Sequence, residues 1–370
     1  MKEIRNIIHQ YDSMDWTEQK AALATVVSVE ESAYRRIGAR MFVQSSGVWI
    51  GGISGGCLEG DALKRAQMAI HKDRPTIVVY DTMEDDAHQI GVGLGCNGRI
   101  EVLFTPINRE ATDNPIEILR KIIHRREPHI LFQLIADHSG KHVLGKVFLD
   151  KDQSGLSDLL QLEPSKLQDY SQAVMEKGKS KVYTTTAIDG QEYVILVEHL
   201  KPEVQLVLIG DNYDVNAFVG IADELGWQIH VVGLIRKIGK GVFEKAHQVL
   251  PYEQVSDIKI DKYSAVVLMS HDYHWDMQML KHFMQHEVGY VGMLGPRKRM
   301  MKMQHELTTD HPTLDLENLS HFYSPVGLDL GAESPEEIAL SITAEIVAVF
   351  RNRSGTHLKF REGTIHEREL

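Results

Sequence analysis

The second half of the sequence alternates short apolar segments with helical patterns, and this alternation constrains the fold more than any other feature. The apolar segments have the length of buried strands. They lie at residues 204–209, 229–232, 265–269 and 289–293, with helical patterns at 214–225 and 274–283. Because such strands have no polar face, they indicate a parallel sheet that helices cover on both sides. Ser334, Pro335 and Glu337 form the start of a final helix, which we expect to end near Arg351.

The first 200 residues predict a separate, less regular α/β domain. Helical patterns occupy residues 3–11, 58–70 and 115–125, and strand patterns occupy 22–29, 41–44, 48–50, 76–80, 100–104, 130–136, 142–149, 181–187 and 192–197. Ser45-Ser46-Gly47 predicts a hairpin turn, whereas residues 150–181 show only a polar stretch. Lys201-Pro202-Glu203 is expected to link the domains. We therefore predict domains at 1–200 and 201–351, followed by a polar, loosely held tail at 352–370.

Composition and charge narrow the classes of function. The net charge of −12 gives no basic face for nucleic acid. No run of about 18 uncharged apolar residues occurs, so we expect no membrane span. The segment from Met1 to Asp12 lacks the apolar stretch of a signal peptide, which favours a cytoplasmic protein. The two cysteines, Cys57 and Cys96, are too few for a four-ligand zinc site, so we expect no metal site and interpret both residues as thiols.

A glycine-rich segment at residues 51–60 carries the first cysteine. Five glycines in ten residues make a backbone that can approach a ligand closely. The segment leads into the helical pattern at Leu58, where free amides favour an anion and the helix dipole favours a thiolate at Cys57. Gly55, Gly56 and Cys57 are therefore candidate cofactor-binding residues. The alternative is a tight loop with a buried, inert cysteine.

A second glycine-rich loop, at residues 91–98, carries the other cysteine, Cys96. Both thiols of the chain thus lie in glycine loops of one predicted domain, and chance is a poor explanation of that placement. Cys96 therefore joins the candidate cofactor-binding residues. The sequence leaves open whether the two loops meet in space.

Residues 204–232 have the strand–helix–strand layout that begins a dinucleotide-binding domain of the Rossmann type. The fingerprint G-x-G-x-x-G reads here Gly210-Asp211-Asn212-Tyr213-Asp214-Val215, so only its first glycine is present. Gly233 stands where an acid would bind the ribose, and two acidic residues add negative charge where phosphate would lie. The sequence thus predicts a Rossmann-like domain with candidate ligand positions at Gly210 and Asn212, but it disfavours NAD(P).

Two further clusters follow strands of the predicted sheet. The carboxyl ends of parallel strands form the ligand crevice in such folds. His271 and Asp272 come after one of these strands, and His271 is a candidate proton donor, whereas Asp272 either contacts a ligand or only caps the next helix. Gly295 and Arg297 come after the next strand, and Arg297 is a candidate phosphate partner. We assign no catalytic residue.

Together these motifs resemble the XdhC/CoxI family of xanthine dehydrogenase accessory factors over nearly the whole chain. The motifs that carry the resemblance are Gly38-Ala39-Arg40-Met41, Gly55-Gly56-Cys57-Leu58-Glu59, Gly93-Leu94-Gly95-Cys96, Ser270-His271-Asp272, residues 290–297 and residues 327–339. The family motif adds Glu59 to the candidate residues, and Cys57 matches the family cysteine implicated in holding the cofactor. Two departures are the glycine-poor loop at Gly210 and Pro296, where relatives usually have a serine.

The resemblance implies a cofactor chaperone rather than an enzyme. Family members are understood to bind the molybdenum cofactor, which we expect here in its molybdopterin form. They support its sulfuration with a cysteine desulfurase and deliver it to xanthine dehydrogenase-type apoenzymes. The chain lacks an iron–sulfur cysteine set, so it is not the complete electron-transfer enzyme. A homodimer is expected on base rates. The alternatives are an NAD(P)-dependent oxidoreductase and a non-catalytic assembly scaffold.

Overall fold

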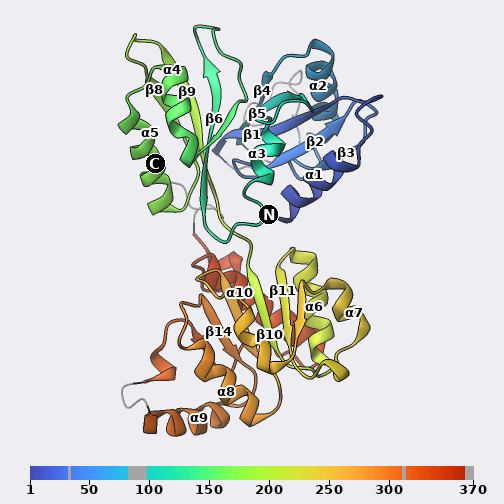
Figure 1. Cartoon of the computed structure of the whole chain (residues 1–370), viewed down its shortest axis with the longest axis vertical. Coiled ribbons are helices and arrows are strands. Elements are labelled where there is room, and N and C mark those ends of the chain that lie inside the picture. The colour runs from blue at the N-terminus through green and yellow to red at the C-terminus, as the bar shows by residue number, and fades with distance from the viewer. Residues whose placement is uncertain (32–34, 82–97, 311–313, 363–370) are drawn as a thin grey trace. The chain divides into compact units, whose positions relative to one another are not determined.

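The chain has a mixed α/β fold, as expected. The computed structural model describes residues 1–31, 35–81, 98–310 and 314–362. The chain divides into two compact units, Met1–Pro202 and Glu203–Leu370 (Figure 1). In the part of the chain that the structure describes, none of the helices combines the length and the apolar character needed to cross a membrane.

The first unit contains a five-stranded antiparallel sheet with the strand order β3-β2-β1-β5-β4. Its strands are β1 (Ala21–Glu31), β2 (Arg40–Gln44), β3 (Trp49–Gly51), β4 (Thr76–Asp81) and β5 (Gly98–Ile107). The expected hairpin between β2 and β3 is confirmed. Helix α2 (Glu59–Lys72) covers one face of the sheet, with the small residues Ala62, Ala66 and Ala69 in the shared core. Small side chains allow the helix and the sheet to approach closely, and residues 52–58 connect the end of β3 to the start of α2.

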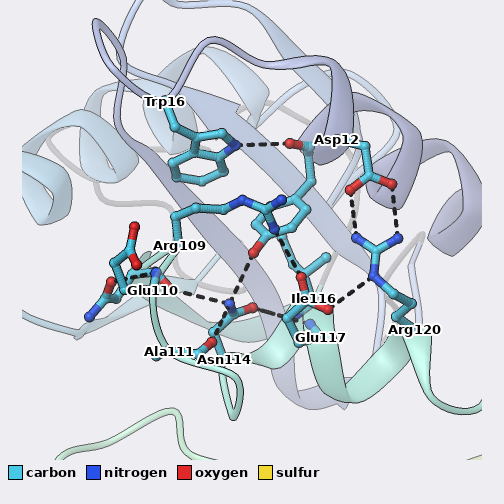
Figure 2. A network of polar contacts seen from close by, with 11 residues as sticks. Asp12, Trp16, Arg109, Glu110, Ala111, Asn114, Ile116, Glu117 and Arg120 are labelled. Atoms are coloured by element: carbon cyan, nitrogen blue, oxygen red, sulfur yellow. Dashed lines mark hydrogen bonds and ion pairs between the residues drawn. The ribbon is translucent and has the colours of Figure 1, made fainter.

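Helices α1 (Lys2–Ser13) and α3 (Pro115–Arg120) contribute to the core on the other side of this sheet. Helix α1 buries the four residues at helical spacing that predicted it, including Tyr11, whereas α3 ends five residues earlier than expected. Figure 2 shows how the two helices are joined. Asn114 caps α3 through its side-chain oxygen, and its amide nitrogen donates to the Tyr11 hydroxyl at 3.1 Å. Arg120 forms a two-bond ion pair with Asp12.

A four-stranded antiparallel sheet with the order β7-β6-β9-β8 completes the first unit. Its strands are β6 (His129–Asp137), β7 (Val147–Leu149), β8 (Lys181–Thr186) and β9 (Glu192–Leu200). The two sheets pack against each other through a small apolar cluster that includes Leu103 and Leu196. The expected strand at 142–149 is wrong in its extent, because only its last three residues pair with β6.

The stretch at 150–181, interpreted from the sequence only as polar, contains two helices. These are α4 (Gln153–Leu160) and α5 (Pro164–Lys177). Leu156 and Leu160 of α4 and Leu167 and Val174 of α5 bury their side chains in the core on the four-stranded sheet. The apolar stripe of each helix is narrow, and the surrounding polar and charged residues obscured it in the sequence.

The second unit is built on a six-stranded parallel sheet with the order β12-β11-β10-β13-β14-β15. Its strands are β10 (Gln205–Ile209), β11 (Gln228–Val232), β12 (Gln248–Leu250), β13 (Ser264–Leu268), β14 (Tyr290–Met293) and β15 (Phe322–Tyr323). Its helices are α6 (Asp214–Leu225), α7 (Lys240–Lys245), α8 (Tyr273–Phe283), α9 (Arg297–Asp310) and α10 (Pro335–Phe350). This is the 3-2-1-4-5-6 order of a Rossmann fold, so the expected Rossmann-like sheet is confirmed.

Both faces of the parallel sheet are buried, as the apolar strands predicted. In β10, Leu206 and Leu208 belong to the core shared with α6 and α10. Val207 and Ile209 belong to the core shared with α8 and α9. The capping box of α10 is also confirmed, because Ser334 and Glu337 each accept a hydrogen bond from the other's backbone amide. The sequence did not predict β12, β15, α7 or α9. Short 3-10 helices occur at Asp150–Asp152, Ile235–Lys237, Tyr252–Asp257, Leu316–Asn318 and Leu358–Phe360.

Candidate functional site

The glycine-rich loop before α2 begins with a tight approach of two backbone segments. Gly51 ends β3 with φ of 81°, and a Cβ atom at this position would collide with the carbonyl oxygen of Arg40 on β2. Farther along the loop, Gly56 has φ of 113°. A positive φ is strained for residues with a side chain, so glycine is required where the loop leaves the strand and where it turns toward α2.

Glu59, the first residue of α2, folds its side chain back into this loop. Its Oε1 accepts hydrogen bonds from the amides of Ile53 and Ser54 at 3.2 and 2.8 Å, and its Oε2 accepts one from the Ser54 hydroxyl at 2.5 Å. Burial alone would raise the pKa of Glu59, but the hydrogen bonds from Ser54 and the loop amides lower it below its usual value. The amides of Ile53 and Ser54 are therefore not free for a ligand, which corrects part of the sequence-based expectation.

Cys57 lies at the open end of the loop. The residue is exposed, as are Gly55 and Gly56, so the alternative that Cys57 is buried is wrong. Its Sγ lies 3.5 Å from the Ser54 Oγ, to which it donates a weak hydrogen bond. The Ser54 Oγ also accepts from the amides of Gly56 and Leu58 at 3.3 and 3.1 Å. Ser54, which the sequence analysis did not single out, is thus the hydroxyl that connects the thiol to Glu59.

Cys96 and most of its glycine loop lie outside the described residues. Its role in cofactor binding therefore stays a prediction. Over the described ranges, no group of three or more His, Cys, Asp or Glu side chains gathers in a way that would hold a metal ion.

In the second unit, Gly210 and Asn212 connect the ends of β10 and β13. A Cβ atom on Gly210 would come within 2.6 Å of the Met269 carbonyl oxygen, so only glycine fits there without a shift of the backbone. The Asn212 side chain donates to the carbonyl oxygen of Ser270 at 3.1 Å. The loop that follows β10 is therefore held against the loop that follows β13, at the carboxyl edge of the sheet where ligands bind in such folds.

Asp211 fills the gap between the ends of β10 and β11. Its buried carboxylate accepts from the Leu234 amide at 2.9 Å and from the Tyr252 hydroxyl at 3.5 Å, and it pairs with Lys237 at 3.2 Å. Burial, followed by the charge of Asp211, raises the pKa of Tyr252 above its usual value. Gly233 allows this arrangement, because a Cβ there would come within 2.9 Å of the Asp211 Cβ.

His271 and Asp272 follow β13 and have different roles. His271 has φ of 59°, and its Nε2 lies 2.8 Å from Oδ2 of Asp214, the first residue of α6. Asp272 accepts from the amides of His274 and Trp275 at 2.8 and 3.1 Å, so the alternative that it caps α8 is confirmed. Direct ligand contacts of either residue stay predictions.

A buried ion pair that the sequence analysis missed lies behind these loops. Asp276 of α8 is fully buried, accepts from the Ser270 hydroxyl at 2.5 Å and pairs with Arg299 at 2.5 Å. Burial raises the pKa of Asp276, although Ser270 and Arg299 act in the opposite direction. Asp276 follows Asp272 by one helical turn. This spacing is the signal in the sequence that could have identified Asp276 as a structural residue.

Gly295 and Arg297 follow β14 at the same edge of the sheet. Gly295 has φ of 131°, and a Cβ there would come within 3.1 Å of the Arg299 Cδ. Arg297 is exposed and pairs with Glu317 at 2.8 Å. Within the basic run after β14, Arg299 is thus the arginine that packs into the unit, whereas Arg297 lies at the surface.

Comparison with known families covers both units of the chain. Residues 206–346 match the XdhC Rossmann domain, and residues 17–81 match the model described as the XdhC and CoxI family. The chain belongs to the XdhC and CoxI family. The resemblance drawn from the sequence motifs is therefore confirmed, and the Cys57 loop and the edge of the parallel sheet both fall within the matched segments of this family.

Relatives in the XdhC and CoxI family align over most of the chain. A Bacillus subtilis (strain 168) protein named as a probable subunit of xanthine dehydrogenase is 29% identical over 343 residues, which cover 91% of this chain and 95% of the relative. An Escherichia coli (strain K12) protein named molybdenum cofactor insertion chaperone PaoD is 22% identical over 332 residues, or 89% and 83% of the two chains.

The fold of this XdhC and CoxI family member is also found in a crystal structure. A protein from Bacillus halodurans described as a xanthine dehydrogenase superposes with a TM-score of 0.71 and 24% identity, covering 96% of this chain and 97% of that chain. At this identity the similarity shows the fold alone.

Proposed function

We propose that this XdhC and CoxI family protein is an accessory factor in molybdoenzyme maturation, a cofactor chaperone rather than an enzyme. It binds the molybdenum cofactor in its molybdopterin form, supports its sulfuration, and assists its insertion into xanthine dehydrogenase-type apoenzymes. Support comes from the names of two relatives, one described as a probable subunit of xanthine dehydrogenase and the other as a molybdenum cofactor insertion chaperone. A cysteine desulfurase is the proposed sulfur donor, and a homodimer is the proposed assembly.

The main observation behind this proposal is the exposed thiol of Cys57, which lies in a loop held in shape by hydrogen bonds among the loop's own residues and Glu59. Glu59 and Ser54 occupy the inner amides of the loop, so its shape does not depend on a ligand. The thiol lies at the open end. Thiolates are soft ligands that suit soft metal centres and sulfur chemistry. The residues present therefore fit a cargo that carries metal-bound sulfur.

The backbone near Cys57 also suits an anionic pterin. Among the described residues, the amides of Gly55 and Cys57 have no hydrogen-bond partner, and both residues are exposed. Backbone N–H groups at the start of a helix favour a negatively charged group. We propose that these amides bind the cofactor, and that Cys96 assists. In the second unit, Gly210, Asn212, His271, Asp272, Gly295 and Arg297 remain proposed ligand positions.

An NAD(P)-dependent oxidoreductase is a weaker alternative, although the strand order is that of a Rossmann fold. Asp211 occupies the gap where β10 and β11 end, and its carboxylate already has three partners. Asp214 adds a second acid at the start of α6 and pairs with His271. Two carboxylates at the position of a dinucleotide pyrophosphate would repel it.

The proposal is tested by the pterin that copurifies with the protein from cells that make the cofactor. The released pterin is oxidised to its fluorescent product and compared among wild type, Cys57→Ala and Cys96→Ala. We expect wild type to retain pterin and Cys57→Ala to lose most of it. The Cys96→Ala variant tests the proposed assisting role of Cys96, and we expect it to retain an intermediate amount of pterin. An absence of pterin from all three proteins would refute the chaperone function and favour an assembly scaffold.

A further inference from the structure

A buried ion pair joins the two sheets of the first unit. It lies next to the start of the glycine-rich segment at residues 51–60, the Cys57 loop. Arg40 of β2 donates from Nη1 to Glu198 Oε1 at 3.0 Å and from Nη2 to Glu198 Oε2 at 2.5 Å. Both side chains are nearly inaccessible, with 6% and 5% exposed. Glu198 lies on β9, in a part of the chain that neither matched family segment includes. Glu198 therefore brings a carboxylate from the four-stranded sheet to β2, a strand that lies within the matched N-terminal segment.

The backbone of Arg40 sets the start of the glycine loop. Its carbonyl oxygen accepts from the Gly52 amide at 2.9 Å, and its amide donates to Glu3 at 3.2 Å. Gly51 crosses so close to the Arg40 carbonyl that no side chain fits. A displacement of Arg40 would therefore move Gly51 and Gly52 directly.

Contacts within the loop would transmit such a displacement to the Cys57 thiol. A Cβ on Gly52 would come within 3.2 Å of the Glu59 Oε1, so this glycine packs closely against the carboxylate that holds Ser54. The Ser54 hydroxyl is in turn the hydrogen-bond partner of the Cys57 thiol. A continuous series of contacts thus runs from Glu198 through Arg40, Gly52, Glu59 and Ser54 to Cys57.

We infer that Glu198 is a positioning residue for the Cys57 loop and acts through Arg40. Stability alone gives little reason for this pair, because well-packed apolar residues often replace a buried ion pair without loss. Two parallel charge-assisted hydrogen bonds, in contrast, fix the Arg40 side chain in one geometry. The inference rests on the proposed function only for the identity of the ligand, since the geometry of the thiol is measured without it.

The test measures the alkylation of Cys57 by iodoacetamide in a Cys96→Ala background, where Cys57 is the one remaining thiol of the sequence. Rates are compared from about pH 6 to about pH 9 for the parent, Glu198→Gln and Glu198→Asp. The control is Asp12→Asn, which breaks the exposed two-bond pair with Arg120 in the same unit. Circular dichroism establishes that each variant is folded.

We expect Glu198→Gln to be alkylated about threefold faster or more, because the thiol loses its contact with Ser54. Glu198→Asp, which keeps the charge, should recover part of the parent rate, and Asp12→Asn should match the parent. If Glu198→Gln does not fold, the double variant Arg40→Met/Glu198→Leu replaces it with the same expected result. A parent-like rate in the folded variant, or an equal change in Asp12→Asn, would overturn the inference.

Failure of the inference and failure of the proposed function are separable. Pterin retention by the wild-type protein, which keeps Cys96, reports on the proposed function and does not depend on Glu198→Gln. A wild-type protein that retains no pterin, together with faster alkylation of Glu198→Gln, would refute the proposed cofactor binding and leave the positioning role intact. A wild-type protein that retains pterin, with alkylation unchanged by Glu198→Gln, would refute only the positioning role.

Discussion

The Asp211 carboxylate accepts a hydrogen bond from the Leu234 amide at 2.9 Å, across the gap between the ends of β10 and β11. In dinucleotide-binding Rossmann domains, an acid at the end of the second strand binds the ribose. Here the acid comes from the neighbouring loop and is bonded within the protein. The Rossmann architecture is thus retained, while the Asp211 carboxylate is already bonded to Leu234, Tyr252 and Lys237 of the protein itself.

The first prediction is that nicotinamide nucleotides do not stabilise the protein. A ligand that binds only the folded state raises the melting temperature, and the stabilisation grows with the logarithm of the ligand concentration relative to its Kd. Because Asp211 and Asp214 add negative charge to the loop after β10, where Rossmann domains bind a dinucleotide, we expect no change in Tm on addition of NADH or NADPH at millimolar concentration. Differential scanning fluorimetry makes this measurement, and a concentration-dependent rise in Tm would contradict it.

Glu59 provides a prediction for the pH dependence of stability. Its pKa is lowered in the folded protein from the ordinary value of 4.5. A carboxyl with a lowered pKa adds stability that is fully present above its unfolded pKa and is lost as the pH falls through its folded pKa. We therefore expect the difference in the free energy of unfolding between wild type and Glu59→Gln to be constant near neutral pH. It should shrink below about pH 4.5.

Urea unfolding at a series of pH values tests this expectation. Glu336→Gln is a suitable control, because Glu336 is an exposed residue of α10 in the other unit. The difference in the free energy of unfolding between wild type and Glu59→Gln could instead stay constant down to the lowest pH at which the protein is folded. That result would contradict the conclusion that the ionised Glu59 carboxylate stabilises the loop.

The two arginines that follow β14 should differ strongly in their effect on stability. Arg299→Met leaves the fully buried Asp276 without its cation, and the loss of one partner of a buried pair costs about 3–5 kcal/mol. Arg297→Met removes an exposed pair with Glu317, and such pairs contribute about 0–1 kcal/mol. Urea unfolding of both variants measures the contrast. Equal losses would show that Arg299 is not the structural arginine.

Asn114 should be important for the attachment of α3 to α1. Its side chain caps α3, and its amide nitrogen contacts Tyr11 (Figure 2). Replacement of an N-cap residue by alanine costs about 0.5–2 kcal/mol. We expect Asn114→Ala to lose at least that amount and Asn114→Ser to recover the capping contribution. Chemical unfolding monitored by Trp fluorescence is suitable, because Trp16 packs edge-on against Tyr11 at 5.0 Å. An unchanged midpoint in Asn114→Ala would contradict this role.

The parallel sheet could be predicted from the sequence, whereas much of the four-stranded sheet region could not. Strands such as β10 bury both faces, so their residues form continuous apolar runs. Helices α4 and α5 each bury only a narrow stripe against one sheet. Their apolar residues are interspersed with polar and charged ones, and tertiary packing rather than local pattern specifies these helices.

The residue types of the candidate site could be predicted from the sequence, but the hydrogen bonds and ion pairs between them could not. The glycines and Cys57 stand together in the sequence, and the family motif includes Glu59. That the Glu59 side chain folds back onto Ser54, or that Glu198 reaches Arg40 across 158 positions of sequence, follows only from the three-dimensional arrangement. Contacts between residues far apart in sequence leave no local periodicity to detect.

The central claim is that Cys57 holds a molybdenum cofactor, and loading of the purified apo-protein tests it most directly. Cofactor released from a molybdoenzyme is mixed under anaerobic conditions with wild type or Cys57→Ala. Molybdenum and pterin are then quantified after gel filtration. We predict that wild type elutes with near-stoichiometric amounts of both and that Cys57→Ala elutes with little of either. Equal retention by the two proteins, or none by wild type, would contradict the claim.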